Sequence, residues 1–282
     1  MTNRKYLLCL IVVILLPLLS ACTNLKQLEV KLGWKNNDFE YIKQGKIKKI
    51  IIQNTRDPGF KFSVTDQKAI EELYNILSSA KTAEVKSELK PDYTFEMYEG
   101  INKVYKFNYI AGLDKKEAGN LYSEDKVYVV SKRIDNDIIK SFWNIRKPRN
   151  FKDIYYGTLL NEIEKYSEGE GKGKSIGINL YDDIEAAKFI LSTDLEEFKN
   201  SLSERVSKAE IKEQPVSDSV EKNYDIIASL KTVGYKTNLY KAELVFSDKK
   251  QNTEKKYYII VLDEHKDGRW RTKVSDKKPD DF

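Results

Sequence analysis

The chain has 282 residues, with 49 lysines and arginines against 44 aspartates and glutamates, so its formal net charge is +5. Its 18 tyrosines and 40% hydrophobic residues exclude a disordered chain, because such chains are poor in aromatic and branched side chains. Two cysteines are too few for a disulfide scaffold. The length suits one large domain or two ordinary ones.

The first 21 residues have the pattern of a signal peptide. Arg4 and Lys5 form a short positive segment, and an uncharged, mostly apolar run of 16 residues follows them. This run is short for a membrane-spanning helix, which needs about 20 apolar residues. Pro17, near the end of the run, also favours a signal peptide over an anchor.

The run closes on a box that resembles the lipobox of bacterial lipoproteins: Leu19, Ser20, Ala21 and Cys22. Small residues let a peptidase close around the extended backbone, and the cysteine thiol accepts a diacylglyceryl group. The resemblance implies cleavage between Ala21 and Cys22 and lipidation of Cys22, and the two acyl chains then suffice for stable anchoring. The alternatives are a plain secretory signal with a chance cysteine, or an uncleaved single helix.

Removal of the signal changes the composition of the chain that remains. Arg4, Lys5 and Cys9 leave with it, so the net charge falls to +3 and, with Cys22 lipidated, no free thiol is left. The exported chain must therefore be stabilised by packing rather than by disulfides. Its acidic and basic side chains are interspersed, so nucleic acid is not an expected partner.

Residues 22–45 lack a hydrophobic period and predict a tether, and residues 46–147 predict an α+β domain. Runs of β-branched residues and period-two alternation indicate its strands, while Ile70, Leu73 and Leu77 share one face of a helix. The expected elements are strands at 46–54 and 60–64, a helix capped by Thr65 or Asp66, strands at 93–98, 102–110 and 126–131, and a helix at 134–143.

A boundary is expected at Lys147-Pro148-Arg149-Asn150, because the proline ends the preceding helix. Residues 148–282 predict a second α+β domain, and Thr193 with Glu196 predicts a capping box at a helix start. The expected elements are helices at 153–166, 183–191 and 194–205 and strands at 176–180, 224–232, 238–247, 257–262 and 269–274. The fold class is therefore α+β, with two domains of antiparallel sheets packed by helices.

Residue patterns that could carry catalysis are weak. Gly173-Lys174-Ser175 matches the end of a phosphate-binding loop, but Glu168 stands where the first glycine is needed and a helix precedes the segment. His265 is the only histidine and can build neither a catalytic triad nor a metal site. No catalytic residue, metal or cofactor is therefore expected, although a carboxylate pair could still meet across a cleft.

Tyr105, Phe107 and Tyr109 point to one side of an expected strand. They could form an aromatic face that binds a glycan or peptide. The alternative is simple packing, because amphipathic rings suit a half-buried sheet face.

Two longer stretches resemble known families. Residues 46–146 run from a β-branched strand through F-x-V-T-D, SSAK and PDYTFEMYEG to an aromatic strand, and they resemble the YhfM-like domain of Gram-positive bacterial lipoproteins. The resemblance implies no catalytic residue. The ending YYIIVLDEHKDGRWRT resembles the final hairpin of curved NTF2-like or cystatin-like sheets.

These observations predict a lipid-anchored protein on the extracytoplasmic face of the cell membrane. The expected role is non-enzymatic interaction with an envelope protein or a wall component. The alternatives are a solute-binding lipoprotein of a transporter and, with less support, a wall-modifying hydrolase.

Overall fold

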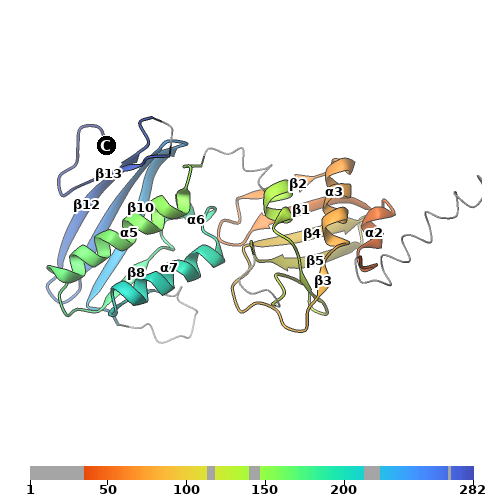
Figure 1. The fold of residues 1–282 in the computed structure, drawn as a ribbon, viewed down its shortest axis with the longest axis horizontal. Coiled ribbons are helices and arrows are strands. Elements are labelled where there is room, and N and C mark those ends of the chain that lie inside the picture. Colours follow the sequence, from red (N-terminus) through yellow and green to blue (C-terminus); the bar gives the residue numbers. More distant parts are fainter. Residues whose placement is uncertain (1–34, 113–117, 140–146, 213–222, 266–267) are drawn as a thin grey trace, which may run out of the picture.

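The computed structural model describes residues 35–112, 118–139, 147–212, 223–265 and 268–282. Figure 1 shows two sheets beside each other, each with helices packed against it, and this confirms the α+β class. Within these ranges, no helix is both long and apolar enough to cross a membrane.

The first sheet has seven strands in the order β2-β1-β4-β5-β6-β7-β3, and every pairing in it is antiparallel. Its elements are α2 (Glu40–Lys43), β1 (Ile47–Asn54), β2 (Lys61–Val64), α3 (Gln67–Leu77), β3 (Lys81–Thr82), β4 (Tyr93–Glu99), β5 (Lys103–Tyr109), β6 (Leu121–Tyr122), β7 (Val127–Val129) and the π-helix η1 (Ile134–Ile139).

Local sequence explains how α3 begins and which face it buries. Asp66 is the N-cap, and its carboxylate accepts a hydrogen bond from the amide of Ala69 at 2.9 Å. The predicted helical face of Ile70, Leu73 and Leu77 is buried in the core of the first sheet. The helix therefore stands as expected, with Asp66 rather than Thr65 as its cap.

The second sheet has six strands in the order β13-β12-β11-β10-β8-β9. Its elements are α5 (Phe151–Glu168), β8 (Ile176–Asn179), α6 (Ile184–Ala187), α7 (Ser192–Arg205), β9 (Ala209–Ile211), β10 (Ile226–Lys236), β11 (Leu239–Asp248), β12 (Thr253–Leu262) and β13 (Arg271–Ser275). The pairings of β10 to β13 are antiparallel, but β8 is parallel to both β9 and β10. Helices α6 and α7 supply the crossover that the parallel pair of β8 and β9 requires.

Two helix predictions need correction. The helix expected at 183–191 shortens to the single turn of α6, and α7 begins at Ser192 with Leu191 as its N-cap. The predicted capping box is therefore wrong, because Thr193 lies inside the helix and its hydroxyl donates to the carbonyl of Ala111 at 3.3 Å. The Thr193 side chain therefore contacts the first domain instead of capping its own helix.

Each sheet has its own hydrophobic core. The first core includes buried side chains from Phe39 to Ile139, and the second includes buried side chains from Phe151 to Val261. The segment 147–150 lies between the two. Leu191 belongs to the second domain, because it directly precedes α7, but its side chain packs against the first core. The two domains therefore share a packed junction.

Candidate functional site at the domain junction

Asp92, immediately before β4, is the centre of the junction. Its side chain is fully buried, and its Oδ1 accepts hydrogen bonds from the amide of Ser192 at 2.8 Å and from Nη1 of Arg56 at 2.6 Å. Its Oδ2 accepts from the amide of Ala111 at 2.8 Å. The carboxylate thus links the start of β4 to the first residue of α7.

Ser192 completes this network with its hydroxyl group. The hydroxyl donates to the carbonyl of Lys90 at 2.7 Å and accepts from Nη2 of Arg56. A further link joins Nδ2 of Asn54 to the carbonyl of Lys188 at 3.4 Å. The backbone of the second domain is therefore held at two points by polar side chains of the first.

Burial raises the pKa of Asp92, while the Arg56 guanidinium and the amides of Ala111 and Ser192 oppose that rise. A buried charge without partners would cost far more than this arrangement does. Arg56 is itself only slightly exposed, so the pair is shielded from solvent and from salt. The network is a structural clamp with both of its charges compensated.

A first hollow at the junction, which we call the basic hollow, has a volume of about 300 Å³. Its walls are mostly apolar, and Arg56 and Lys90 are its charged residues. It is lined by Thr55, Arg56, Lys90 and Pro91 from the first domain and by Leu180, Tyr181, Ala187, Ile190, Leu195 and Ile211 from the second. An apolar cavity with a few polar groups, set between domains, is typical of small-molecule sites.

A second hollow, the carboxylate hollow, has a volume of about 480 Å³ and also contains residues of both domains. Asp135 from η1 and Asp194 from α7 line it, and burial raises the pKa of each carboxyl group. Both have structural partners. Asp135 accepts from the hydroxyl of Tyr109 and the amide of Gly112, and Asp194 lies 3.5 Å from Nζ of Lys152.

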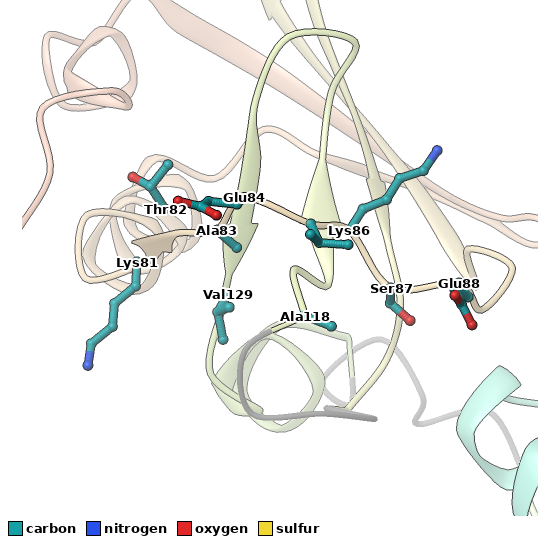
Figure 2. A pocket seen from close by; sticks show the side chains of 10 residues that line it. Lys81, Thr82, Ala83, Glu84, Lys86, Ser87, Glu88, Ala118 and Val129 are labelled. Atoms are coloured by element: carbon teal, nitrogen blue, oxygen red, sulfur yellow. The ribbon is translucent and has the colours of Figure 1, made fainter.

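A third hollow follows the chain after α3 and is lined by residues 81–88 together with Ala118 and Val129. Figure 2 shows the side chains of Lys81 and Lys86 extending in different directions rather than toward a common point. Charged groups that do not converge provide no fixed position for a ligand. This surface is a weaker candidate than the junction.

The predicted lipobox, Leu19, Ser20, Ala21 and Cys22, lies outside the described residues. The predicted aromatic face lies on β5 and turns inward. Tyr109 is fully buried, Phe107 is 8% exposed, and Tyr105 stacks on Tyr41 with ring centroids 3.9 Å apart. Phe107 and Tyr109 therefore belong to the core, which corresponds to the packing alternative, and they offer no ring to a ligand.

The glycine-rich segment that partly matches a phosphate-binding loop has a structural role. Lys174 Nζ donates to Asp248 at 2.6 Å, and the Ser175 hydroxyl donates to Asp225 at 2.9 Å, so the glycine-rich segment is tied to β11 and to the start of β10. His265 is exposed in the connection between β12 and β13. Among the described residues, no cluster of three or more His, Cys, Asp or Glu side chains could hold a metal ion.

The junction itself was not predicted from the sequence. Pro91 and Asp92 stand at a strand start, where an aspartate is unremarkable, and Ser192 lies between two expected helices. One feature of the sequence is consistent with the Arg56–Asp92 ion pair: both residues flank expected strands and carry opposite charges. Only the pairing of β1 with β4 places those two residues side by side.

Together, the two sheets and the Asp92 clamp define an α+β protein with two hollows at its domain junction. Residues 43–148 match the family model YhfM, described as YhfM protein. The chain therefore contains a YhfM-like domain, which covers the whole first sheet together with α3 and η1, while α2 lies almost entirely before it. No curated protein and no solved structure matches the chain.

Proposed function

We propose that this chain is a lipid-anchored extracytoplasmic protein of the bacterial cell envelope and that its two domains act as a non-enzymatic binding module. The location rests on the signal-like residues 1–21 and on Cys22 at the end of the box. The binding role rests on the junction, where the Asp92 clamp fixes two domains around two hollows. The partner is an envelope protein or a wall component rather than nucleic acid.

Lipid labelling tests the anchor. Cells that express the protein with radiolabelled palmitate should yield a labelled band, and globomycin should leave an unprocessed precursor. Cys22→Ala should abolish labelling, whereas Cys9→Ala, a matched cysteine that lies inside the signal, should leave it unchanged. Normal labelling of the Cys22→Ala protein would refute the anchor.

Cross-linking tests the binding role. The anchored protein should be cross-linked in intact envelopes and its adducts compared with those of an Asp92→Ala variant, in which the clamp is broken. A specific adduct that depends on Asp92 supports a binding surface built at the junction. An identical adduct pattern in both proteins would place the binding surface elsewhere.

A solute-binding lipoprotein of a transporter is the second candidate, and the basic hollow is the observation that favours it. Such proteins bind small molecules between domains, and this hollow combines apolar walls with Arg56 and Lys90. Thermal shifts with panels of amino acids, sugars and peptides separate the two candidates, because a true ligand stabilises the folded chain by mass action.

A wall-modifying hydrolase has the least support. Asp135 and Asp194 do line one hollow, but their carboxylates already hold Tyr109, Gly112 and Lys152. Turnover of peptidoglycan fragments that is lost in both Asp135→Asn and Asp194→Asn would establish this activity against the binding role.

A further inference from the structure

The end of the first domain opposite the junction, which we call the distal end, is defined by Lys43, Lys46, Lys48, Ile101 and Lys103. Strand topology places it there. β4 starts beside the Asp92 clamp and runs to Glu99, which pairs with Ile47 of β1 and with Lys103 of β5. Seven residues of strand span about 20 Å, so the β4–β5 turn is that far from the junction.

Ile101 occupies the tip of this turn and is 96% exposed, the highest value among the exposed large hydrophobic residues of the described chain. Gly100, with φ of +69°, provides the left-handed backbone that the tight turn requires. A single exposed isoleucine has no meaning by itself. Its surroundings decide whether it has a role.

The surroundings of Ile101 are basic. Lys46 and Lys48 are exposed, and the charge of Lys46 acts on Glu99 together with that of Lys103. The carboxylates of this end are compensated from within the domain. Glu99 accepts from the hydroxyl of Tyr105 and lies 3.1 Å from Lys103. Glu40 accepts from the hydroxyl of Tyr74 and lies 3.7 Å from Lys43.

The position of the N-terminal part of the described chain also favours contact between the distal end and the membrane. Helix α2 directly precedes β1, whose first residue lies at the distal end, and Figure 1 shows α2 on the side of the first domain away from the second. Cys22 stands 13 residues before Lys35, where the described chain begins. Thirteen residues reach at most about 45 Å, so a lipid at Cys22 would leave the distal end within reach of the membrane surface.

We propose that the distal end rests on the anionic surface of the membrane that holds the lipid anchor, with Ile101 inserted among the headgroups. Lysines near a membrane surface are attracted to anionic lipids, and an apolar side chain beside them enters the interface. This proposal depends on the proposed anchor at Cys22. It orients the molecule so that the junction and its two hollows face away from the membrane.

Tryptophan quenching tests the contact on the full lipidated protein. Ile101→Trp and Ile184→Trp place a probe at two exposed isoleucines, one at the distal end and one on α6 of the second domain. On phosphatidylglycerol vesicles with brominated acyl chains, we expect at least a twofold loss of the added fluorescence at position 101 and none at position 184. The unsubstituted protein supplies the background of the three native tryptophans.

The outcomes separate the contact from the anchor. Vesicle-bound protein with an unquenched probe at position 101, or with equal quenching at both positions, would overturn the contact and leave the anchor intact. Failure of the unsubstituted lipidated protein to sediment with vesicles would instead overturn the anchor.

Charge reversal tests the basic component. Lys46→Glu with Lys48→Glu should reduce quenching at position 101 at least twofold, and phosphatidylcholine vesicles should do the same, while the bound amount stays constant. The matched control, Lys231→Glu with Lys236→Glu on exposed positions of β10, should change nothing. Equal quenching in both double variants would show that the lysines of the distal end do not contact lipid.

Discussion

The Asp92 carboxylate accepts a hydrogen bond from the amide of Ser192 at 2.8 Å, across one hundred residues of sequence and between two domains. That amide is at the first residue of α7, where backbone donors lack partners within the helix. A carboxylate at a helix start is also favoured by the helix dipole. Asp92 therefore acts as a cap for α7 that is supplied by the other domain.

Removal of this carboxylate should destabilise the protein strongly. Asp92→Ala leaves the Arg56 charge without its partner and two amides without acceptors. Loss of one member of a buried ion pair costs about 3–5 kcal/mol in the free energy of unfolding. Urea unfolding measures that loss, and hydrogen exchange should show faster exchange at the amides of Ala111 and Ser192.

Asp66→Ala is the matched control. It also removes a carboxylate that caps a helix, but α3 lies within one domain and Asp66 is exposed. We expect a loss of about 1 kcal/mol, the usual value of an N-cap. Equal losses in the two variants would mean that Asp92 is an ordinary cap and not a clamp.

Stability should depend on pH through Asp183, which is buried with Thr232 and Tyr155 as its hydrogen-bond partners. Burial raises the pKa of its carboxyl group above the unfolded value of about 3.9. Its contribution is therefore complete below the unfolded pKa and is lost as pH rises through the folded pKa. From about pH 7 to about pH 4, the wild-type free energy of unfolding should rise relative to that of Asp183→Asn.

Asp225 should show the opposite sign. Lys250 and the amide and hydroxyl of Ser175 lower its pKa, so its contribution is present above the unfolded pKa and is lost as the solution becomes more acidic. The difference between wild type and Asp225→Asn should therefore shrink below about pH 4. Parallel curves for both variants would contradict the assignment of burial as the dominant effect at Asp183.

The basic hollow should discriminate anionic from neutral ligands. Anilinonaphthalene sulfonate and N-phenylnaphthylamine share one apolar body and differ by the sulfonate. Lys90→Glu should weaken binding of the first by about fivefold, since one charge interaction near the surface is worth about 1 kcal/mol, and should leave the second nearly unchanged. Fluorescence titration gives both dissociation constants.

Two controls locate that binding. Ala187→Trp fills the hollow and should weaken both probes, whereas Lys68→Glu, an exposed lysine on α3, should affect neither. Binding that Ala187→Trp leaves untouched would show that the probes occupy another site.

Gly177 allows β8 to pack closely against Tyr224. A Cβ at this position would lie 2.4 Å from the tyrosine ring, so Gly177→Ala should overpack the second core and cost about 1–3 kcal/mol. At Gly157, in the middle of α5, an added Cβ would instead extend into open space. Gly157→Ala should therefore stabilise the protein by about 0.5–1 kcal/mol, as alanine is favoured over glycine within helices. Thermal and urea unfolding compare the two.

Local patterns predicted much of the fold. The alternation in β4 and β5 and the helical spacing of Ile70, Leu73 and Leu77 are decided by neighbours close in sequence, and the structure confirms them. β3, β6 and β9 could not be predicted, because two or three residues without a longer apolar run around them are too short to show a period. The parallel pairing of β8 was missed because pairing direction depends on the whole crossover.

The site was the least predictable part. Thr193 and Glu196 have the local signature of a capping box, yet the start of α7 is fixed by Asp92, one hundred residues earlier. A local pattern cannot reveal a partner that only tertiary packing supplies. The two hollows could not be predicted for the same reason, because their walls come from segments far apart in the chain.

The Asp92 clamp also affects whether the YhfM-like segment can fold in isolation. The family match ends at residue 148, but Ser192, whose amide donates to Asp92, and Leu191, which packs against the first core, come from beyond that point. A fragment cut at the end of the match would carry a buried acid and base with one face newly open to water. The segment defined by sequence relatedness is thus smaller than the unit that completes its own structure.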